Sequence, residues 1–334
     1  MFQNMRWKEI VSQKTIDWLL GPENPSIRFW ALQQLEDRSI NDQEVKETQD
    51  VVMATSCVKA IFKAQKAEGH WGHYENMYEP KYVTTTHTLL ILAELGAKRT
   101  PKIEKAIEYL FMFQRNSGHF LMELPKTEKG KASKVKDACC LDGNILYYLI
   151  HFGYLSDERT QKLIDFQVDY HSDDVGGWKC RAYPIDKNAV YPENCYMGGV
   201  KMLRALSKIP KAQRSRDINR IIKQEVEIIL SNEIYRYRRN PDGSRKDKAG
   251  WKRFGFPLFY QSDTLEVLDI LTELGIKDKR MQDSIDLLIG SQVDGKWLLK
   301  NTFNGKMLCE IDEKNKPSKW ITLRAARVLK RYLG

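Results

Sequence analysis

The 334-residue sequence lacks the features that define membrane, exported and disulfide-stabilised proteins. Its longest apolar runs, such as residues 88–93, are far shorter than the ~18 residues that a membrane span needs. The first ten residues lack the basic, apolar and small-residue layout of a signal peptide, so we expect a cytoplasmic protein. Six cysteines in so long a chain do not form a disulfide framework. We expect reduced thiols, with metal binding as the alternative.

Two further absences narrow the fold and the chemistry. No glycine-rich loop of the Walker or Rossmann kind is present, so nucleotide-driven chemistry is not expected. No segment has the alternating apolar and polar residues that predict a strand. The 42% hydrophobic content is nevertheless enough to build a large core. The sequence therefore predicts a folded, helical protein.

An internal repeat dominates the chain. One recurring unit is a Gln followed by a Gly and an aromatic residue, at Gln65–Trp71, Gln114–Phe120, Gln292–Trp297 and, in a stretched copy, Gln167–Trp178. A second unit is an apolar helical stretch that ends in Gly or Pro, at residues 96, 153, 210, 275 and 334. The intervals between these ends are 57, 57, 65 and 59 residues, which is typical of a repeat protein.

Each repeat predicts a pair of helices, because its apolar residues have helical spacing. The first helices are expected near 46–66, 101–115, 157–170, 213–234 and 279–291. The second helices are expected near 83–95, 139–152, 194–208, 259–274 and 318–332. An incomplete pair at 12–20 and 26–37 brings the number of pairs to six.

The second helices are apolar around more of their circumference than the first, which indicates an inner ring of helices inside an outer ring. We therefore predict an all-α fold, an (α/α)6 toroid of six helical hairpins. The whole chain, 1–334, forms a single domain in this prediction, and 1–45 forms its incomplete first hairpin. A straight solenoid is the alternative, but it would expose one face of the second helices.

The Gln-x(2–3)-Gly-x-Trp/Phe motif at the end of an outer helix resembles the repeat of squalene and terpenoid cyclases and of protein prenyltransferase β subunits. Those proteins are α/α toroids, and the resemblance covers essentially the whole chain. It implies that the Gln and Trp of the motif tie loops to helix ends. The Asp-x-Asp-Asp run with which terpenoid cyclases protonate an alkene does not occur in this sequence.

One rim of the toroid should carry long loops. The connections from first to second helices are much longer than the others, at 67–82, 116–138, 171–193, 235–258 and 292–317. Because binding residues concentrate in long loops over a rigid scaffold, we expect the functional mouth on this rim. The loops 126–136 and 236–253 carry net charges of +4 and +6, which together equal the +10 of the chain. This charge favours an anionic ligand such as a diphosphate, although basic loops can also be simply solvated. Nucleic acid is not expected, because no binding motif is present.

Reactive side chains begin the inner helices beneath this rim. Cys140 and Cys195 occupy equivalent positions in successive repeats. With His87 or Asp142 they would supply three zinc ligands and leave a fourth position open. A His on a packed helix is also often a core residue, so His87 could be either a zinc ligand or part of the core.

The segment from Glu193 to Tyr196 is similar to the Asp-x-Cys-Tyr zinc motif of protein prenyltransferases, with Glu193 in place of the Asp. Gln261 follows Tyr260 where their His ligand would stand. Cys140 and Cys195 also look similar to the two thiolates of lanthionine cyclases, but Tyr196 replaces the adjacent His. Both resemblances imply a zinc site, and both are incomplete.

Carboxylates and aromatic residues give further candidates. Asp142, Glu193 and Asp263 begin three successive inner helices and could serve as general acid and base in a carbohydrate-active enzyme. An Asp near a helix start also commonly caps the helix. The catalytic candidates are Asp142, His87, Tyr260 and Asp263. The ligand-binding candidates are Glu193, Tyr196, Gln261, Trp320, Lys319 and Arg253, and Tyr147 joins the aromatic wall of the cavity.

These observations favour an enzyme that binds an anionic, partly apolar ligand, like an isoprenoid diphosphate, in a central cavity, with zinc as a candidate cofactor. The resemblance implies a transferase or a lyase. One alternative is a carbohydrate-active hydrolase or lyase that uses the cavity carboxylates. Another is a non-catalytic protein that binds a partner through its basic rim. The oligomeric state is not predicted.

Overall fold

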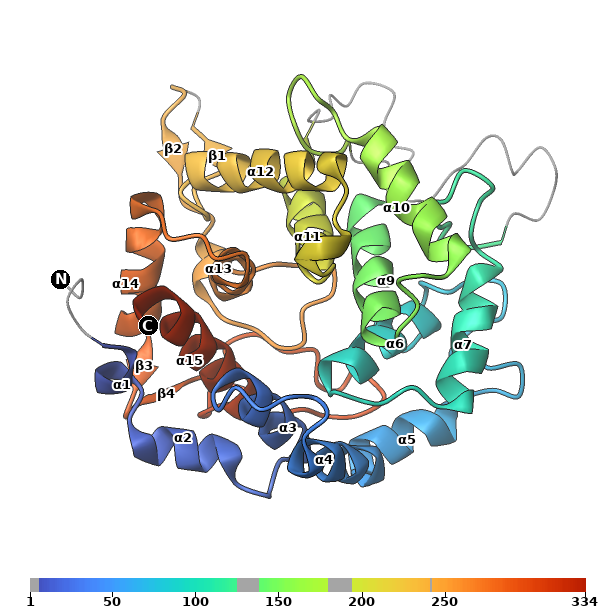
Figure 1. Cartoon of the computed structure of the whole chain (residues 1–334), viewed down its shortest axis with the longest axis horizontal. Coiled ribbons are helices and arrows are strands. Elements are labelled where there is room, and N and C mark those ends of the chain that lie inside the picture. The colour runs from blue at the N-terminus through green and yellow to red at the C-terminus, as the bar shows by residue number, and fades with distance from the viewer. Residues whose placement is uncertain (1–5, 125–137, 180–193, 241) are drawn as a thin grey trace.

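A computed structural model describes residues 6–124, 138–179, 194–240 and 242–334. Its helices alternate along the chain between an outer and an inner ring (Figure 1). The outer helices are α2 (Gln13–Leu20), α4 (Gln43–Ala54), α5 (Ser56–Ala64), α7 (Pro101–Phe111), α10 (Glu158–Tyr170), α12 (Arg216–Ser231) and α14 (Gln282–Gly290). The inner helices are α3 (Pro25–Gln34), α6 (Thr85–Glu94), α9 (Cys139–His151), α11 (Tyr196–Ser207), α13 (Thr264–Glu273) and α15 (Lys319–Leu333). The predicted (α/α)6 toroid is confirmed.

The remaining elements are short. They are α1 (Trp7–Ile10), the 3-10 turns η1 (Lys211–Gln213), η2 (Ala249–Lys252) and η3 (Lys279–Met281), and two hairpins formed by β1 (Arg238–Arg239) with β2 (Arg245–Lys246) and β3 (Gln292–Val293) with β4 (Lys296–Trp297). No helix in the described part of the chain is long and apolar enough to cross a bilayer.

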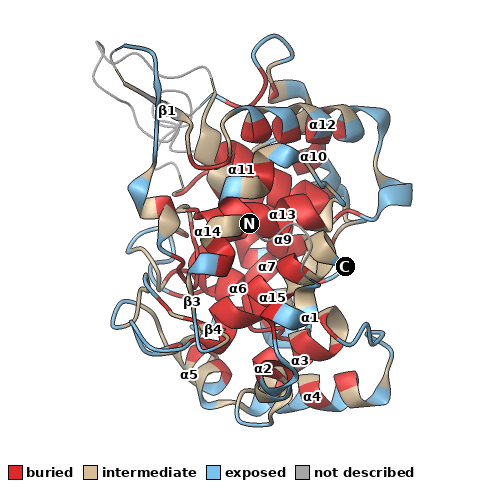
Figure 2. Cartoon of the chain, turned by 90° about the vertical axis from the view of Figure 1, so that its left-hand side faces the viewer, coloured by how far each residue is buried: buried red, intermediate tan, exposed pale blue. Residues whose placement is uncertain are grey.

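Burial separates the two rings as the sequence predicts. Every residue of α6 is buried, whereas α12 buries only the face that carries Ile218, Ile222 and Val226. Figure 2 shows the buried residues concentrated in the inner helices and along one side of the outer ones. One predicted helix is wrong: 46–66 is two helices, because Thr55 adopts an extended backbone and caps α5 with its side chain.

The ring is closed, which excludes the straight solenoid. The C-terminal helix α15 packs against α1, α2 and α3 at the other end of the chain as well as against α13. A disulfide between Cys57 of α5 and Cys309 further joins segments separated by 252 residues. The expectation of reduced thiols is therefore wrong for this pair.

The repeat motif ties loops to helix ends, as the family resemblance implies. The indole Nε1 of Trp71 donates to the carbonyl of Ile61, 2.7 Å away, near the end of α5. Gln65 donates from Nε2 to the carbonyls of Gly69 in its own loop and Lys102 in the next outer helix. These contacts fix the long loops, and with them the starts of the inner helices, to the outer ring.

Candidate functional site

A cavity of about 220 Å³ lies among the inner helices, and all six of them contribute to its wall. Four cationic and four acidic side chains line it: Arg204, Lys208, Arg324, Arg327, Glu94, Glu266, Asp269 and Glu273. The aromatic rings of Trp30, Tyr147 and Trp320 also line it. We call this space the axial cavity.

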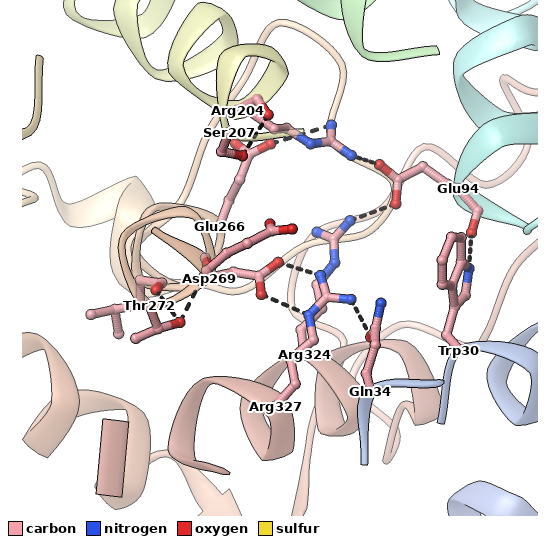
Figure 3. Close-up of polar contacts among 12 residues, drawn as sticks. Trp30, Gln34, Glu94, Arg204, Ser207, Glu266, Asp269, Thr272, Arg324 and Arg327 are labelled. Carbon is pink, nitrogen blue, oxygen red and sulfur yellow. Dashed lines mark hydrogen bonds and ion pairs between the residues drawn. The ribbon is translucent and has the colours of Figure 1, made fainter. Parts of the chain in front are cut away.

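Glu94, the last residue of α6, joins two guanidinium groups in the axial cavity (Figure 3). Arg204 of α11 donates to Oε1, and Arg324 of α15 donates from Nη2 to Oε2 at 2.8 Å. All three side chains are buried. Burial alone would raise the pKa of Glu94, but the two guanidinium groups outweigh it and lower the pKa to about 2. Glu94 is therefore a permanent anion.

Both arginines keep donors that this carboxylate does not use. Nη1 of Arg204 is buried without a hydrogen bond, and its ion-pair distance to Glu266 Oε1 is 3.6 Å, too long for one. Within the described residues, the only side-chain hydrogen bond of Arg324 goes to Glu94. The Arg204 guanidinium also lies 3.7 Å from the centre of the Tyr147 ring. Burial and the charge of Glu94 raise the pKa of Tyr147 to about 12, so its hydroxyl stays protonated and can donate.

Two other ion pairs occupy the same space. Lys201 of α11 is completely buried, and its Nζ lies 2.7 Å from both carboxylate oxygens of Glu266. Asp269 accepts from Arg327 Nε at 2.7 Å and from Arg331 Nη1 at 2.9 Å. Burial would raise the pKa of Asp269, but these two arginines hold it well below its usual range.

The axial cavity opens on the rim opposite to the predicted one. Side-chain exposure is 5% for Arg324 and 7% for Glu94, but 30% for Lys208 and 25% for Glu273, which lie at the C-terminal ends of α11 and α13. The mouth therefore faces the short connections. At the long-loop end, the described rings of Tyr82 and Phe303 stack at 4.3 Å and cover the axis together with Phe259 and His87.

Of the aromatic residues predicted to line the cavity, Trp320 and Tyr147 do so. Trp320 also stacks on Phe256 with ring centres 4.1 Å apart. Tyr196 lies elsewhere: its hydroxyl donates to the carbonyl of Ile234 at 2.6 Å. Tyr260 lines a separate space of about 10 Å³ together with His87 and Cys140.

His87 and Gln261 belong to the long-loop end. His87 Nδ1 lies 3.0 Å from Thr84 Oγ1, and burial, assisted by the charge of Lys81, lowers the pKa of His87 to about 3. Its imidazole is therefore neutral at physiological pH. Gln261 Oε1 is buried and has no hydrogen bond within the described structure.

Asp142 and Asp263 fix loops to helix starts. Asp142 accepts from the backbone N–H of Phe120 at 3.1 Å, as Thr85 accepts from Trp71 and Thr322 from Trp297 at equivalent places in the repeat. Gln167 donates to the second oxygen of Asp142 at 2.7 Å. Asp263 caps α13 by accepting from the N–H of Glu266 at 2.8 Å, and its other oxygen accepts from the N–H of Gly255 in the preceding loop at 2.8 Å. Burial raises the pKa of Asp263 to about 6.

The remaining candidates do not line the axial cavity. Lys319 Nζ pairs with Glu23 at 3.0 Å, and Arg253 is exposed at the long-loop rim. Glu193 lies outside the described residues. The basic loop 126–136 also lies outside them, whereas Arg236 of the second basic loop pairs with Asp247 and Asp283.

The predicted zinc ligands do not come together. Cys140 faces the small space beside His87, whereas Cys195 immediately precedes α11. Hydrogen bonds from Phe120 and Gln167 occupy both oxygens of Asp142. Across the described residues, no three His, Cys, Asp or Glu side chains are arranged to hold a metal ion. The described residues therefore do not fit zinc, and no step of the proposed chemistry uses it.

The candidates predicted from the sequence do not include the charged residues of the axial cavity, although the sequence contains a signal for them. Glu94, Arg204 and Asp269 interrupt the most apolar helices of the chain, in LLILAEL, MLRALS and VLDILTE. A charge on a helix that is buried on all sides is costly unless it is paired or binds a ligand. That criterion selects these residues.

No protein-family model and no curated protein matches this chain. Among solved structures, an unsaturated glucuronyl hydrolase specific for heparin is 12% identical, with a TM-score of 0.48 over 95% of this chain and 85% of the other. Type II terpene cyclase MstE from Scytonema is 13% identical, with a TM-score of 0.46 over 92% and 87%. A sugar epimerase from a ruminal bacterium is 12% identical, with a TM-score of 0.44 over 73% and 70%. These proteins are enzymes, but likeness at this level does not indicate what this chain binds.

Proposed function

We propose that the protein is an enzyme that binds a small anionic substrate in the axial cavity, with the anionic group held by Arg204 and Arg324. The observation that carries this proposal is the buried arrangement of two guanidinium groups on one carboxylate. Glu94 neutralises only one of the two positive charges. The donors left over face a cavity, and guanidinium groups are the side chains best suited to bind carboxylates and phosphates.

The wall also offers groups for acid–base chemistry beside the bound anion. Glu266 lines the cavity 3.6 Å from Arg204, and although Lys201 donates to both of its oxygens, a carboxylate has further lone pairs with which it can accept a proton from the substrate. The Tyr147 hydroxyl can donate one hydrogen bond to developing negative charge. These roles replace those expected for Asp142 and Asp263, which do not line the axial cavity.

Size and polarity favour a small polar substrate over a long isoprenoid chain. The volume of about 220 Å³ lies below the roughly 300–1,000 Å³ of pockets for drug-sized ligands. Charged side chains outnumber aliphatic ones among the lining residues. A hydroxylated substrate, as in the carbohydrate-active alternative, also suits a wall that mixes Trp30 and Trp320 with charged groups.

A ligand panel tests the proposal by thermal shift. Phosphate, tartrate, glycerol 1-phosphate, glycerate and geranyl diphosphate are added to the wild type, Arg324→Gln and Arg324→Lys. Exposed Arg253→Gln is the matched control. We expect a small anion to raise the Tm of the wild type and of Arg253→Gln but not of Arg324→Gln. Arg324→Lys should show a reduced shift, because lysine keeps the positive charge but cannot donate two parallel hydrogen bonds as a guanidinium group does. The proposal is wrong if no anion shifts the Tm, or if Arg324→Gln responds like the control.

A further inference from the structure

We infer that the substrate carries two negative charges on one end group, the charge state of a phosphate monoester at neutral pH. This inference rests on the proposed function and names its substrate class. It follows from the balance of charge in the axial cavity, from the place where that charge is buried, and from the donors that remain unused.

The ion pairs of the axial cavity leave two positive charges without a partner. Lys201–Glu266 and Lys208–Glu273 each match one cation with one carboxylate and contribute no net charge, whichever partner holds the proton. Arg204 also lies 3.6 Å from Glu266, but it donates its hydrogen bond to Glu94 and is counted there. Glu94 instead meets two arginines, and so does Asp269. The six cations of this network therefore exceed its four carboxylates by two: Lys201, Arg204, Lys208, Arg324, Arg327 and Arg331 against Glu94, Glu266, Asp269 and Glu273.

Both surplus charges act on the same part of the cavity. Arg324 and Arg327 are three residues apart on α15, and both side chains line the axial cavity (Figure 3). Arg327 acts electrostatically on Glu94 and on Tyr147, as Arg204 and Arg324 do. Because water screens charges in this buried region poorly, an excess of positive charge there is unfavourable, and a bound anion neutralises that excess.

The free donors belong to groups that surround one carboxylate, because Arg204 and Arg324 both bind Glu94 and the Arg204 guanidinium lies 3.7 Å from the centre of the Tyr147 ring. They belong to Arg204, whose Nη1 is buried without a hydrogen bond, to Arg324 and to the Tyr147 hydroxyl. Arg327 has none to offer there, because it donates from Nε and Nη2 to Asp269 and from Nη1 to Gln34. A single doubly charged group therefore fits better than two carboxylates at opposite ends of a ligand. Arg204 and Arg324 bind its oxygens, and Arg327 contributes charge alone.

Isothermal titration calorimetry with three probes tests this inference. Glycerol 1-phosphate carries two charges on one group, tartrate carries two on separate groups, and glycerate carries one. We expect glycerol 1-phosphate to bind about tenfold or more tightly than glycerate, with tartrate between them. Its affinity should fall between pH 7 and pH 5, because the second pKa of a phosphate monoester is about 6. Glycerate, which stays singly charged, controls for any effect of pH on the protein.

Arg327→Gln is the decisive variant, because it removes one surplus charge but none of the free donors. We expect it to weaken glycerol 1-phosphate binding by a larger factor than glycerate binding, so that the preference for the doubly charged group shrinks, while Arg327→Lys keeps the preference. Should glycerate bind as tightly as glycerol 1-phosphate, with both lost in Arg324→Gln, the inference is wrong and the proposed function stands. Tighter binding of tartrate would also overturn it. If none of the probes binds, the proposed function itself fails.

Discussion

Arg324 and Glu94 are separated by 230 residues in the sequence, yet Arg324 Nη2 donates a 2.8 Å hydrogen bond to Glu94 Oε2 on the axis of the ring. Arg204 binds the other oxygen, so one carboxylate connects α6, α11 and α15. The centre of this toroid is therefore held by ion pairs within an apolar frame. The same contacts stabilise the fold and shape the proposed binding site.

Glu94→Gln should destabilise the protein strongly. The substitution keeps the size of the side chain but leaves two buried guanidinium groups without a counter-charge. Breaking a buried ion pair in this way costs about 3–5 kcal/mol. Urea unfolding measures the loss. Glu273→Gln is the matched control: its partner Lys208 is 30% exposed, and we expect at most about 1 kcal/mol. Equal losses in the two variants would contradict a central role for Glu94.

The stabilisation from Glu94 should depend on pH with a defined sign. Its pKa falls from an ordinary 4.5 to about 2 on folding, so the folded state favours the ionised form. The contribution is fully present above pH 4.5 and is lost as the pH falls toward 2. The difference in unfolding free energy between the wild type and Glu94→Gln should therefore shrink across that interval in urea titrations. A difference that stays constant from pH 6 to pH 3 would rule this account out.

The fold could be predicted because it depends on local patterns. The period of the breaker residues and the Gln–Gly–aromatic motif mark each hairpin, and the motif contacts of Trp71 and Gln65 show why those residues recur. The burial of α6 on all sides follows from its composition. These signals lie within single repeats and need no knowledge of distant contacts.

A charge within an apolar helix marks Glu94, Arg204 and Asp269 as candidates, but which of these residues meet depends on contacts that no local pattern shows. Trp320 and Tyr147 were predicted because any aromatic residue on an inner helix has a good chance of facing the axis. Cys140 and Asp142 were favoured by residue type, but loops and packing determine where they lie. Which arginine meets Glu94 depends on how the ring closes, and the pairing of Cys57 with Cys309 depends on the same closure.

The disulfide should be detectable and stabilising. Alkylation of the unfolded, unreduced protein should leave Cys57 and Cys309 unmodified, as peptide mass analysis can establish. Because the disulfide closes a loop across 252 residues, Cys57→Ser should lower the unfolding free energy by about 2–4 kcal/mol. Cys195→Ser, whose thiol is not part of a disulfide, is the control. Full alkylation of Cys309 without a reductant would show that the pair is reduced.

Gly143→Ala should separate α9 from α11 and disturb the axial cavity. A Cβ at Gly143 would lie 2.6 Å from the carbonyl carbon of Lys201 and 2.7 Å from the backbone N of Met202, and backbone atoms cannot move aside as a flexible side chain can. Overpacking of this kind costs about 1–3 kcal/mol. The shift of α11 would also displace Arg204, so we expect anion binding to weaken together with stability.

Gly290→Ala is the matched control, because nothing lies within 4 Å of its Cβ and alanine is the better helix former in α14. Urea unfolding and calorimetry on both variants check the prediction, and a Gly143→Ala protein as stable as Gly290→Ala would refute the close contact of the two helices.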